Sequence, residues 1–463
     1  MDRKVEPTMS KTASLLEFSK YTSLSVLGMA AISGYILADT FFIARGLGAD
    51  GLAALNLAMP TYNFIHGVGL MLGMGAATRF SVCKSRGEGR QADVMFTAAL
   101  CLGAGFALLF LALGLFFSRP LTALLGADRT IFEMSNTYLK VLLLFSPAFL
   151  LNDILLCFIR NDGNPRLSMV ATVTGSLANV VLDYIFIFPC GMGIFGAVFA
   201  TGLAPVIGIA VMAPHWLSRS KGFHLTAPER LGGPFRMTLS LGFPSLLGQV
   251  SSGIVTIVLN ILILGLMGNT GVAAYGVIAN LSLVVVAIYT GIAQGVQPLL
   301  SRAHGLRDRA ALLRYLRYAL VTMLALSALM YAGIFCFAGP IAALFNSDGS
   351  PQLQQIAVTG LKIYFTSVAF VGYNTVISTY FTSVERPLPA HVISLLRGLV
   401  LIIPAAVALS ALWGMTGVWL SFPATELAVA GVGAGLYLRS RKSEPVRGSA
   451  EENGGDQQKE EVP

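Results

Sequence analysis

Two aspartates stand inside long apolar stretches of this 463-residue chain. Asp39 follows Ile-Leu-Ala and precedes Thr-Phe-Phe-Ile-Ala, and Asp183 lies in the run Val-Val-Leu-Asp-Tyr-Ile-Phe. An ionised carboxyl group is costly inside a bilayer unless it is paired, so a carboxyl group there indicates a functional site. Such a group can bind and release a proton, or it can supply oxygen ligands to a hard cation.

Each aspartate has a polar neighbour four residues earlier in the sequence. Tyr35 precedes Asp39, and Asn179 precedes Asp183, a spacing that places both members of each pair on one helix face. Asn179 and Asp183 would offer oxygens to a cation or hydrogen bonds to a protonated acid, and Thr201 adds a hydroxyl. Two structural alternatives remain: Asp39 caps a helix end, and Asp183 takes part in a hydrogen-bonded clamp between helices.

Other polar residues in apolar stretches are candidates of a second kind. Asn152 and Asp153 either line the same cavity or have a structural role. Glu426 and Arg397 either form a buried pair or reach the membrane interface separately. We interpret His66 as a packing or hydrogen-bonding residue rather than as a proton relay.

The composition indicates that helices crossing a membrane carry these residues. Hydrophobic residues make up 55% of the chain, charged residues only 12%, and the mean hydropathy is +0.72. A soluble chain carries about 25% charged residues. Apolar runs of about 20 residues recur, which is long enough to cross a bilayer, and the backbone then has to be helical. We predict an all-α polytopic membrane protein with twelve transmembrane helices, at 21–43, 52–77, 95–117, 137–159, 167–188, 194–216, 237–265, 271–300, 313–337, 357–383, 389–411 and 415–438.

The second half of the chain repeats the first about 220 residues later. Gly48-Ala-Asp-Gly-Leu-Ala-Ala-Leu55 returns as Gly268-Asn-Thr-Gly-Val-Ala-Ala-Tyr275, and Gly69-x-x-x-Gly73 returns as Gly291-x-x-x-Gly295. The glycine pairs predict close helix packing. A repeat of membrane spans predicts two pseudo-symmetric six-helix lobes around a central site. The expected divisions are a leader (1–20), a first lobe (21–216), a connection (217–236), a second lobe (237–438) and a disordered tail (439–463).

The repeat and the charges also indicate where coupling takes place and how the chain is oriented. Asp39, Asp153 and Asp183 correspond in the second half to Asn260, Asn374 and Pro404, which places titratable coupling in the first half. Loops after the even-numbered spans are rich in Lys and Arg, whereas the alternate loops carry only Arg45, Arg119 and Arg129. The positive-inside rule then places both termini in the cytoplasm. Because the basic residues are scattered over short loops, the net charge of +8 does not indicate nucleic-acid binding. The five scattered cysteines indicate neither a disulfide framework nor a metal knuckle.

Several motifs together resemble those of the multidrug and toxic compound extrusion (MATE) transporters, with a general similarity to the bacterial MepA-type branch. The motifs are Asp39-Thr-Phe-Phe-Ile43 with Gly46-Leu-Gly48, Arg160 with Gly163 and Pro165, Asn179-x-x-x-Asp183, and Gly191-Met-Gly-Ile-Phe-Gly-Ala197 with Ala200-Thr201. The similarity extends over roughly residues 15–440. It implies two lobes that alternate between inward and outward access, driven by entry of H⁺ or Na⁺.

The resemblance implies one coupling cluster in the first lobe, made of Tyr35, Asp39, Asn179, Asp183 and Thr201. A Na⁺ ion would bind at Asp39, Asn179, Asp183 and Thr201. Some members of the family use acidic residues on the seventh and tenth spans, where this chain offers Gln249 and Asn374, which we assign with Asn152 and Asp153 to the substrate cavity.

We therefore expect a secondary active multidrug antiporter of the bacterial inner membrane, with no enzymatic activity. It would act as a monomer on drug-like, lipophilic or cationic compounds, and it would need no cofactor besides the coupling ion. A flippase for lipids or lipid-linked oligosaccharides of the same superfamily is the alternative. A polytopic membrane enzyme is a more distant one, because the five histidines form no catalytic or metal-binding motif.

Overall fold

The computed structural model describes residues 11–218, 221–227, 231–346 and 349–442. In this part of the chain all the regular secondary structure is helical. The first lobe holds α1 (Lys11–Ser85), α2 (Gly89–Phe116), α3 (Ser118–Leu124), α4 (Phe132–Leu144), α5 (Ser146–Asn161), α6 (Pro165–Ile187) and α7 (Gly193–Trp216). The second lobe holds α8 (Gly232–Gly305), α9 (Arg309–Phe345), α10 (Pro351–Tyr364), η1 (Phe365–Ser367), α11 (Val368–Ser383), α12 (Pro387–Leu395), η2 (Leu396–Val400) and α13 (Ile402–Lys442).

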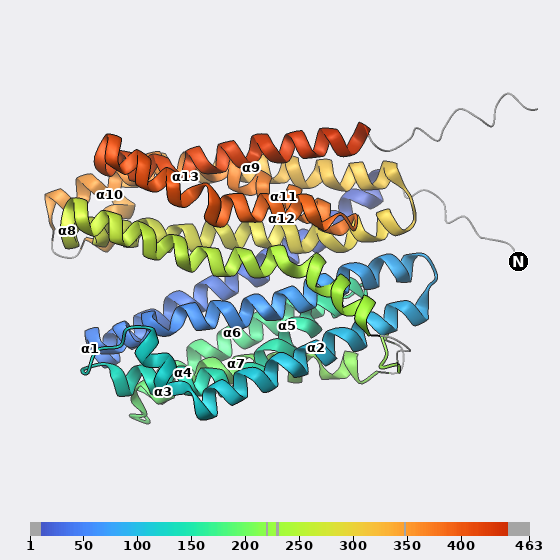
Figure 1. The fold of residues 1–463 in the computed structure, drawn as a ribbon, viewed down its shortest axis with the longest axis horizontal. Helices are drawn as coiled ribbons and strands as arrows, with labels where there is room; N and C mark the ends of the chain where they lie inside the picture. The colour runs from blue at the N-terminus through green and yellow to red at the C-terminus, as the bar shows by residue number, and fades with distance from the viewer. Residues whose placement is uncertain (1–10, 219–220, 228–230, 347–348, 443–463) are drawn as a thin grey trace, which may run out of the picture.

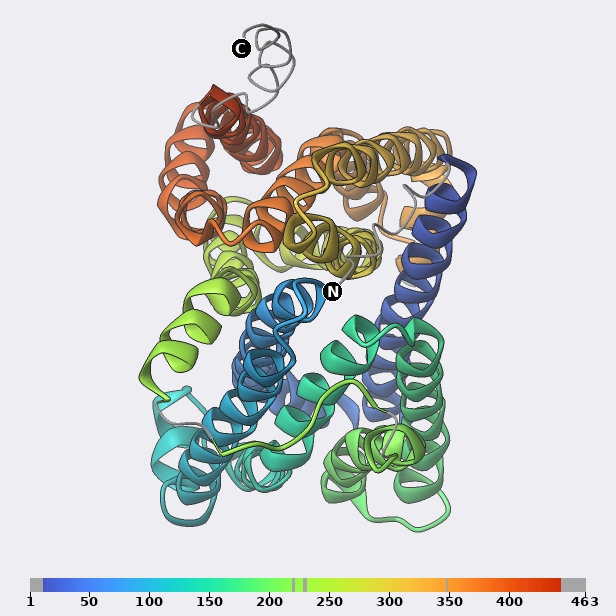
Figure 2. The same cartoon turned by 90° about the vertical axis from the view of Figure 1, so that its right-hand side faces the viewer.

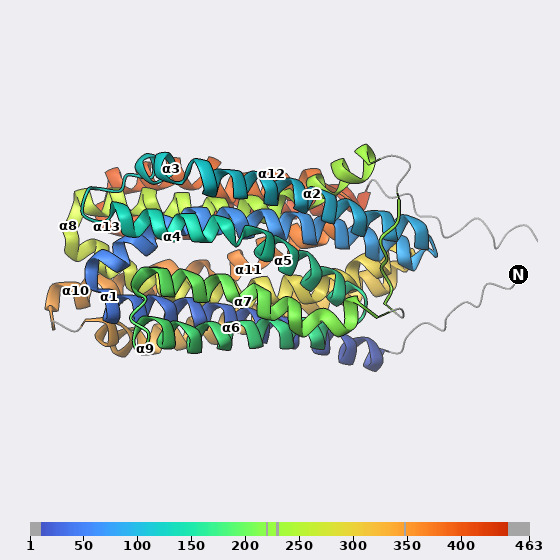
Figure 3. The same ribbon diagram turned by 90° about the horizontal axis from the view of Figure 1, so that it is seen from below.

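These helices make twelve apolar crossings in the described part of the chain. Eight helical stretches are long and apolar enough to cross a membrane, and α4 with α5 form a ninth that is bent by 48° where the two helices meet (Figure 3). Three of the eight stretches are long enough for two crossings each: α1, α8 and the run Pro387–Arg441. The all-helical fold predicted from the sequence is confirmed.

Glycines make the turns between paired crossings. Gly48 in α1 has φ 68° and ψ −157°, and Gly268 in α8 has φ 61° and ψ −155°. A positive φ is costly for residues that carry a Cβ, so glycine suits both turns. The two breaks are at corresponding positions of the repeat and have nearly the same geometry. The backbone therefore follows the repeat seen in the sequence.

The helices form two bundles with separate apolar cores. Figure 1 shows α1–α7 in one bundle and α8–α13 in the other, and Figure 2 shows the pair along the bundle axis. The start of α1 is an exception, because Phe18 and Tyr21 belong to the core of the second lobe. We call the end of the molecule where α1 begins and α13 ends the terminal end. The opposite end, which holds the breaks at Gly48 and Gly268, is the kink end.

Close packing joins the lobes toward the terminal end. A Cβ at Gly291 would lie 2.5 Å from Cα of Val26, and one at Gly295 would lie 2.6 Å from Cα of Thr22. Only glycine permits this approach of α8 to α1, as the Gly-x-x-x-Gly spacing predicts. The first-half glycine pair also packs closely, but within its own lobe, because Gly73 lies against Cys157 of α5.

Polar contacts between the lobes lie toward the same end. Arg302 donates to Glu17 at 2.7 Å and Arg79 donates to Glu385 at 2.5 Å. Deeper in the bundle, Gln297 of α8 accepts from the Asn161 amide at 3.0 Å. Together with the glycine contacts, these bonds hold the two lobes together at the terminal end.

Candidate functional site

Three elements bring the predicted coupling residues together. The first crossing of α1 carries Asp39, α6 carries Asn179 and Asp183, and α7 carries Thr201. All four are buried, with Asp39 6% exposed and Asp183 fully enclosed. The start of α6 is fixed by Asn164, whose side chain accepts from the Leu167 N–H at 3.1 Å and caps the helix.

The carboxyl groups of Asp39 and Asp183 lie within hydrogen-bonding range of each other. Each keeps one buried oxygen, Oδ1, that has no hydrogen-bond partner among the described residues. Two ionised carboxylates have only acceptors to offer each other. A proton or a hard cation between them would satisfy these oxygens. The pair is therefore suited to binding a small positive charge.

Asn179 links this pair to α7. With its amide nitrogen turned toward Asp183, Asn179 donates to Asp183 Oδ2 at 3.1 Å and accepts from the Thr201 N–H at 3.2 Å. This orientation satisfies both ends of the amide. The Thr201 hydroxyl donates to the Ala197 carbonyl at 3.1 Å, a common arrangement for a buried helical threonine. The lone pairs of the hydroxyl oxygen remain available to accept from a neighbour.

Tyrosines surround the acid pair, and two of them were missed from the sequence. The Tyr35 hydroxyl lies 2.5 Å from the Tyr62 hydroxyl, with Asp39 nearby. Tyr138 lies beside Thr201, with both aspartates nearby. Nothing in the sequence distinguishes Tyr62 and Tyr138 from the other tyrosines, because their partners come from distant segments. The structure adds two hydroxyl groups to the predicted cluster.

The four residues that we assigned to a substrate cavity do not form one group. Asp153 pairs with His66, whose Nδ1 lies 2.8 Å from Asp153 Oδ2. The amide oxygen of Asn152 instead lies against Gly208 of α7, within the first lobe. Gln249 lies opposite Gly67, where α8 meets α1. The structure therefore places these residues in separate surroundings, outside the Asp39–Asp183 cluster.

Asn374, the fourth of these residues, belongs to a polar network inside the second lobe. Its amide donates to the Glu426 carboxylate at 2.7 Å and to the Glu426 backbone carbonyl at 2.9 Å. Arg397 donates to the same carboxylate at 3.0 Å and to the Thr375 hydroxyl at 3.1 Å. Of the two arrangements that the sequence allowed, Arg397 and Glu426 adopt the buried pair.

Family comparison agrees with this two-lobed arrangement. The sequence model of the MatE family matches the chain twice, over residues 25–185 and 244–408. The chain belongs to the MatE family. One match falls in each lobe, so the internal repeat corresponds to two copies of the MATE unit. The resemblance drawn from the sequence motifs is confirmed.

Relatives of this MATE transporter cover nearly all of its length. An FAD transporter of Shewanella oneidensis is 26% identical over 91% of this chain and 94% of its own. The multidrug export protein MepA of Staphylococcus saprophyticus is 25% identical over 88% of this chain and 90% of its own. The crystal structure of a mutant of the Vibrio cholerae MATE transporter VcmN superposes with a TM-score of 0.87 at 22% identity, covering 94% of this chain and 98% of that one. This superposition supports the fold.

Proposed function

We propose that this MATE transporter exports lipophilic, often cationic, small molecules in exchange for H⁺ or Na⁺. The observation that carries the proposal is the buried contact between the Asp39 and Asp183 carboxyl groups, each with an unpartnered oxygen. A proton or Na⁺ between them would draw α1 toward α6. Release of that ion would leave two carboxylates, which can only accept hydrogen bonds, in contact with each other. The same packing of α1 against α6 would then be less favourable.

Such an ion-dependent change in packing is suited to alternating access. The contacts between Arg79 and Glu385 and between Arg302 and Glu17 close the terminal end. If that end faces the cytoplasm, as the basic loops predict, this conformation is closed toward the cytoplasm. Moving one charge through 100 mV supplies about 2.3 kcal/mol. That energy corresponds to a roughly fiftyfold concentration gradient at equilibrium.

The relative named as an FAD transporter supports a second candidate substrate, an anionic flavin dinucleotide. A third candidate function is a lipid or lipid-linked oligosaccharide flippase, which we expect to hold phosphates with cavity arginines or lysines. The central candidates in the first lobe are acidic instead. Arg397 in the second lobe already has Glu426 as its counter-charge, which does not favour an anionic substrate there.

The test is transport by the full chain in proteoliposomes, with a pH gradient and a Na⁺ gradient imposed in separate experiments. We expect one of the two gradients to drive uptake of ethidium, a lipophilic cation. Parallel measurements with FAD and with a fluorescent lipid separate the candidate substrates. Uptake of FAD but not ethidium would exclude drug export. Equal ethidium uptake with and without both gradients would exclude ion coupling.

A further inference from the structure

A second pair of titratable side chains lies outside the Asp39–Asp183 cluster. His66 is on the second crossing of α1 and Asp153 is on α5, and the ring Nδ1 lies 2.8 Å from the carboxylate. With its proton on Nδ1, the nitrogen nearest Asp153, the neutral ring can accept a second proton at Nε2. The carboxylate would stabilise the resulting imidazolium, as a paired acid does for a general base.

Glycine packing positions this pair. A Cβ at Gly69 would lie 3.0 Å from the Asp153 Cβ, and one at Gly73 would lie 2.9 Å from the Cys157 sulfur. The absence of side chains at these two positions lets α1 approach α5. His66 is three residues before Gly69 on the same helix, so the approach brings its ring to the carboxylate.

Two tyrosines lie between this pair and the first cluster. The Tyr62 ring stacks on His66 with 6.1 Å between ring centroids and 12° between ring planes. Its hydroxyl lies 2.5 Å from that of Tyr35, which is one helical turn from Asp39. The order Asp39, Tyr35, Tyr62, His66, Asp153 therefore runs along the inside of the first lobe toward the terminal end.

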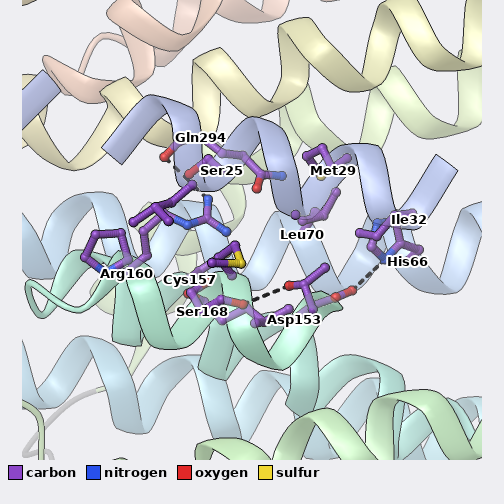
Figure 4. A pocket seen from close by; sticks show the side chains of 16 residues that line it. Ser25, Met29, Ile32, His66, Leu70, Asp153, Cys157, Arg160, Ser168 and Gln294 are labelled. Atoms are coloured by element: carbon purple, nitrogen blue, oxygen red, sulfur yellow. Dashed lines mark hydrogen bonds and ion pairs between the residues drawn. The ribbon is translucent and has the colours of Figure 1, made fainter. Parts of the chain in front are cut away.

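A small cavity adjoins the pair at the contact between the lobes. It measures about 30 Å³ and is lined by His66, Asp153, Arg160 and Gln294, among others (Figure 4). A volume of this size holds one or two water molecules beside several polar groups. Gln294 belongs to α8, and Arg160 donates to its carbonyl at 3.4 Å across the lobe boundary. Separation of the lobes at the terminal end would open this cavity.

Few other charges face the pair. Tyr62 on α1 and Cys157 and Arg160 on α5 are the titratable or charged groups around it in the described part of the chain. The residues that α6 and α8 contribute to the lining are uncharged, for example Ser168 and Gln294. A proton gained by His66 would be stabilised mainly by Asp153.

We propose that His66 and Asp153 form a second proton-exchange site, which passes protons between the Asp39–Asp183 pair and the solvent at the terminal end. His66 Nε2 takes up a proton through water and the tyrosine hydroxyls, and it returns the proton to water when the lobes part beside Arg160. This assignment revises the packing role inferred for His66 from the sequence. It rests on the proposed function, with H⁺ as the coupling ion.

The test compares His66→Gln and Asp153→Asn with the wild-type chain in proteoliposomes, using ethidium as the probe. His391→Gln is the matched control, because the His391 ring also lies inside the bundle and bonds the Ser240 carbonyl at 2.6 Å. Two rates are measured across a range of pH: uptake driven by a pH gradient, and ethidium counterflow without a gradient. Counterflow reports folding, binding and lobe movement independently of net proton transfer.

We expect both variants to lose on the order of a hundredfold in gradient-driven rate, the usual scale for a positioned acid or base. Counterflow should stay near wild type and lose its pH dependence, and His391→Gln should behave as wild type. An unchanged driven rate and pH profile would overturn the proposal. Equal losses in both rates would indicate a structural role and would also overturn it. If His66→Gln does not fold, the same measurements on Asp153→Asn test the proposal, with the same outcomes for and against it.

The outcomes also separate this inference from the proposed function. If Asp39→Asn abolishes coupling while His66→Gln remains coupled, the antiport function stands and the second proton site does not. If only a Na⁺ gradient drives transport by the wild-type chain, the antiport function again stands and the second proton site does not. If neither gradient drives it, the proposed function itself fails.

Discussion

Asp39 on the first crossing and Asp183 on the fifth meet with their carboxyl groups within hydrogen-bonding range. Each of the two carboxyl groups also has a buried oxygen without a hydrogen-bond partner among the described residues. The ion site that we propose therefore straddles α1 and α6. Occupancy of that site by a positive charge is therefore linked to how α1 packs against its own lobe.

Asp39→Asn and Asp183→Asn should each abolish gradient-driven export. Asparagine has nearly the size of aspartate, but it cannot release a proton and it offers a weaker cation site. Expression, membrane insertion and substrate counterflow should remain; immunoblots of membrane fractions check the first two, and proteoliposome counterflow checks the third. Glu133→Gln is the control, since Glu133 is an exposed carboxylate paired with Arg119 at 2.6 Å. Normal driven export by both aspartate variants would rule out the coupling site.

Gly295→Ala should destabilise the state that is closed at the terminal end. The added Cβ would lie 2.6 Å from Cα of Thr22, so α8 would have to move off α1. Overpacking of this kind costs about 1–3 kcal/mol. Spin labels at the exposed Leu225 and Leu306 should report a larger population of long distances. The backbone on either side of Leu225 bonds Asp93 and Thr97 of the first lobe, and Leu306 directly follows α8 of the second. Gly276→Ala, which meets nothing within 4 Å, should leave the distribution unchanged.

Glu385→Gln should weaken the same closed state through charge. Glu385 has φ 58°, an unfavourable conformation for a residue with a side chain, and its carboxylate lies 2.5 Å from Arg79 and 3.7 Å from Arg86. Loss of a partly exposed ion pair costs up to about 1 kcal/mol, a roughly fivefold population change. Spin labels at Leu225 and Leu306 measure this change in the population of the closed state. If Arg79→Gln and Glu385→Gln have additive effects, the two residues do not act as a pair.

Glu426→Gln should lower thermal stability more than the double variant Arg397→Gln/Glu426→Gln. Arg397 lies 3.0 Å from the buried Glu426 carboxylate, so the single change leaves a charge in the bundle without its counter-charge. Breaking a buried ion pair lowers the free energy of unfolding by roughly 3–5 kcal/mol. Removing both charges restores much of that lost stability. Melting temperatures of the purified variants measure the effect. Equal melting temperatures for the single and double variants would argue against a buried pair.

Cys190 should react with an impermeant maleimide added to intact cells. It is exposed and lies just after α6, at the end that the basic loops place outside. Leu225→Cys in a Cys190→Ser background should react only after the membrane is opened. Cys190→Ser alone gives the background from the other cysteines. Labelling at position 225 in intact cells would reverse the predicted orientation.

The sequence by itself determined the membrane crossings, the internal repeat and the presence of a few acidic residues inside apolar spans. Apolar length fixes a crossing because a bilayer demands about 20 apolar residues. Gly48 and Gly268 occupy matching positions of the repeat, each between two apolar spans. Asp39 and Asp183 were recognisable because charged residues inside apolar spans are costly. Each of these inferences uses only the types of residues and their spacing along the chain.

Only the tertiary structure decided which distant side chains meet. Helical spacing places Tyr35 on the same helix face as Asp39, whereas the structure places its hydroxyl against that of Tyr62. Asp153 was grouped with Asn152, its neighbour in the chain, but it pairs with His66 on another helix. Periodicity defines the face of a helix but not its rotation or its partner across a bundle. Those are set by how side chains of all sizes, and the glycines between them, pack together.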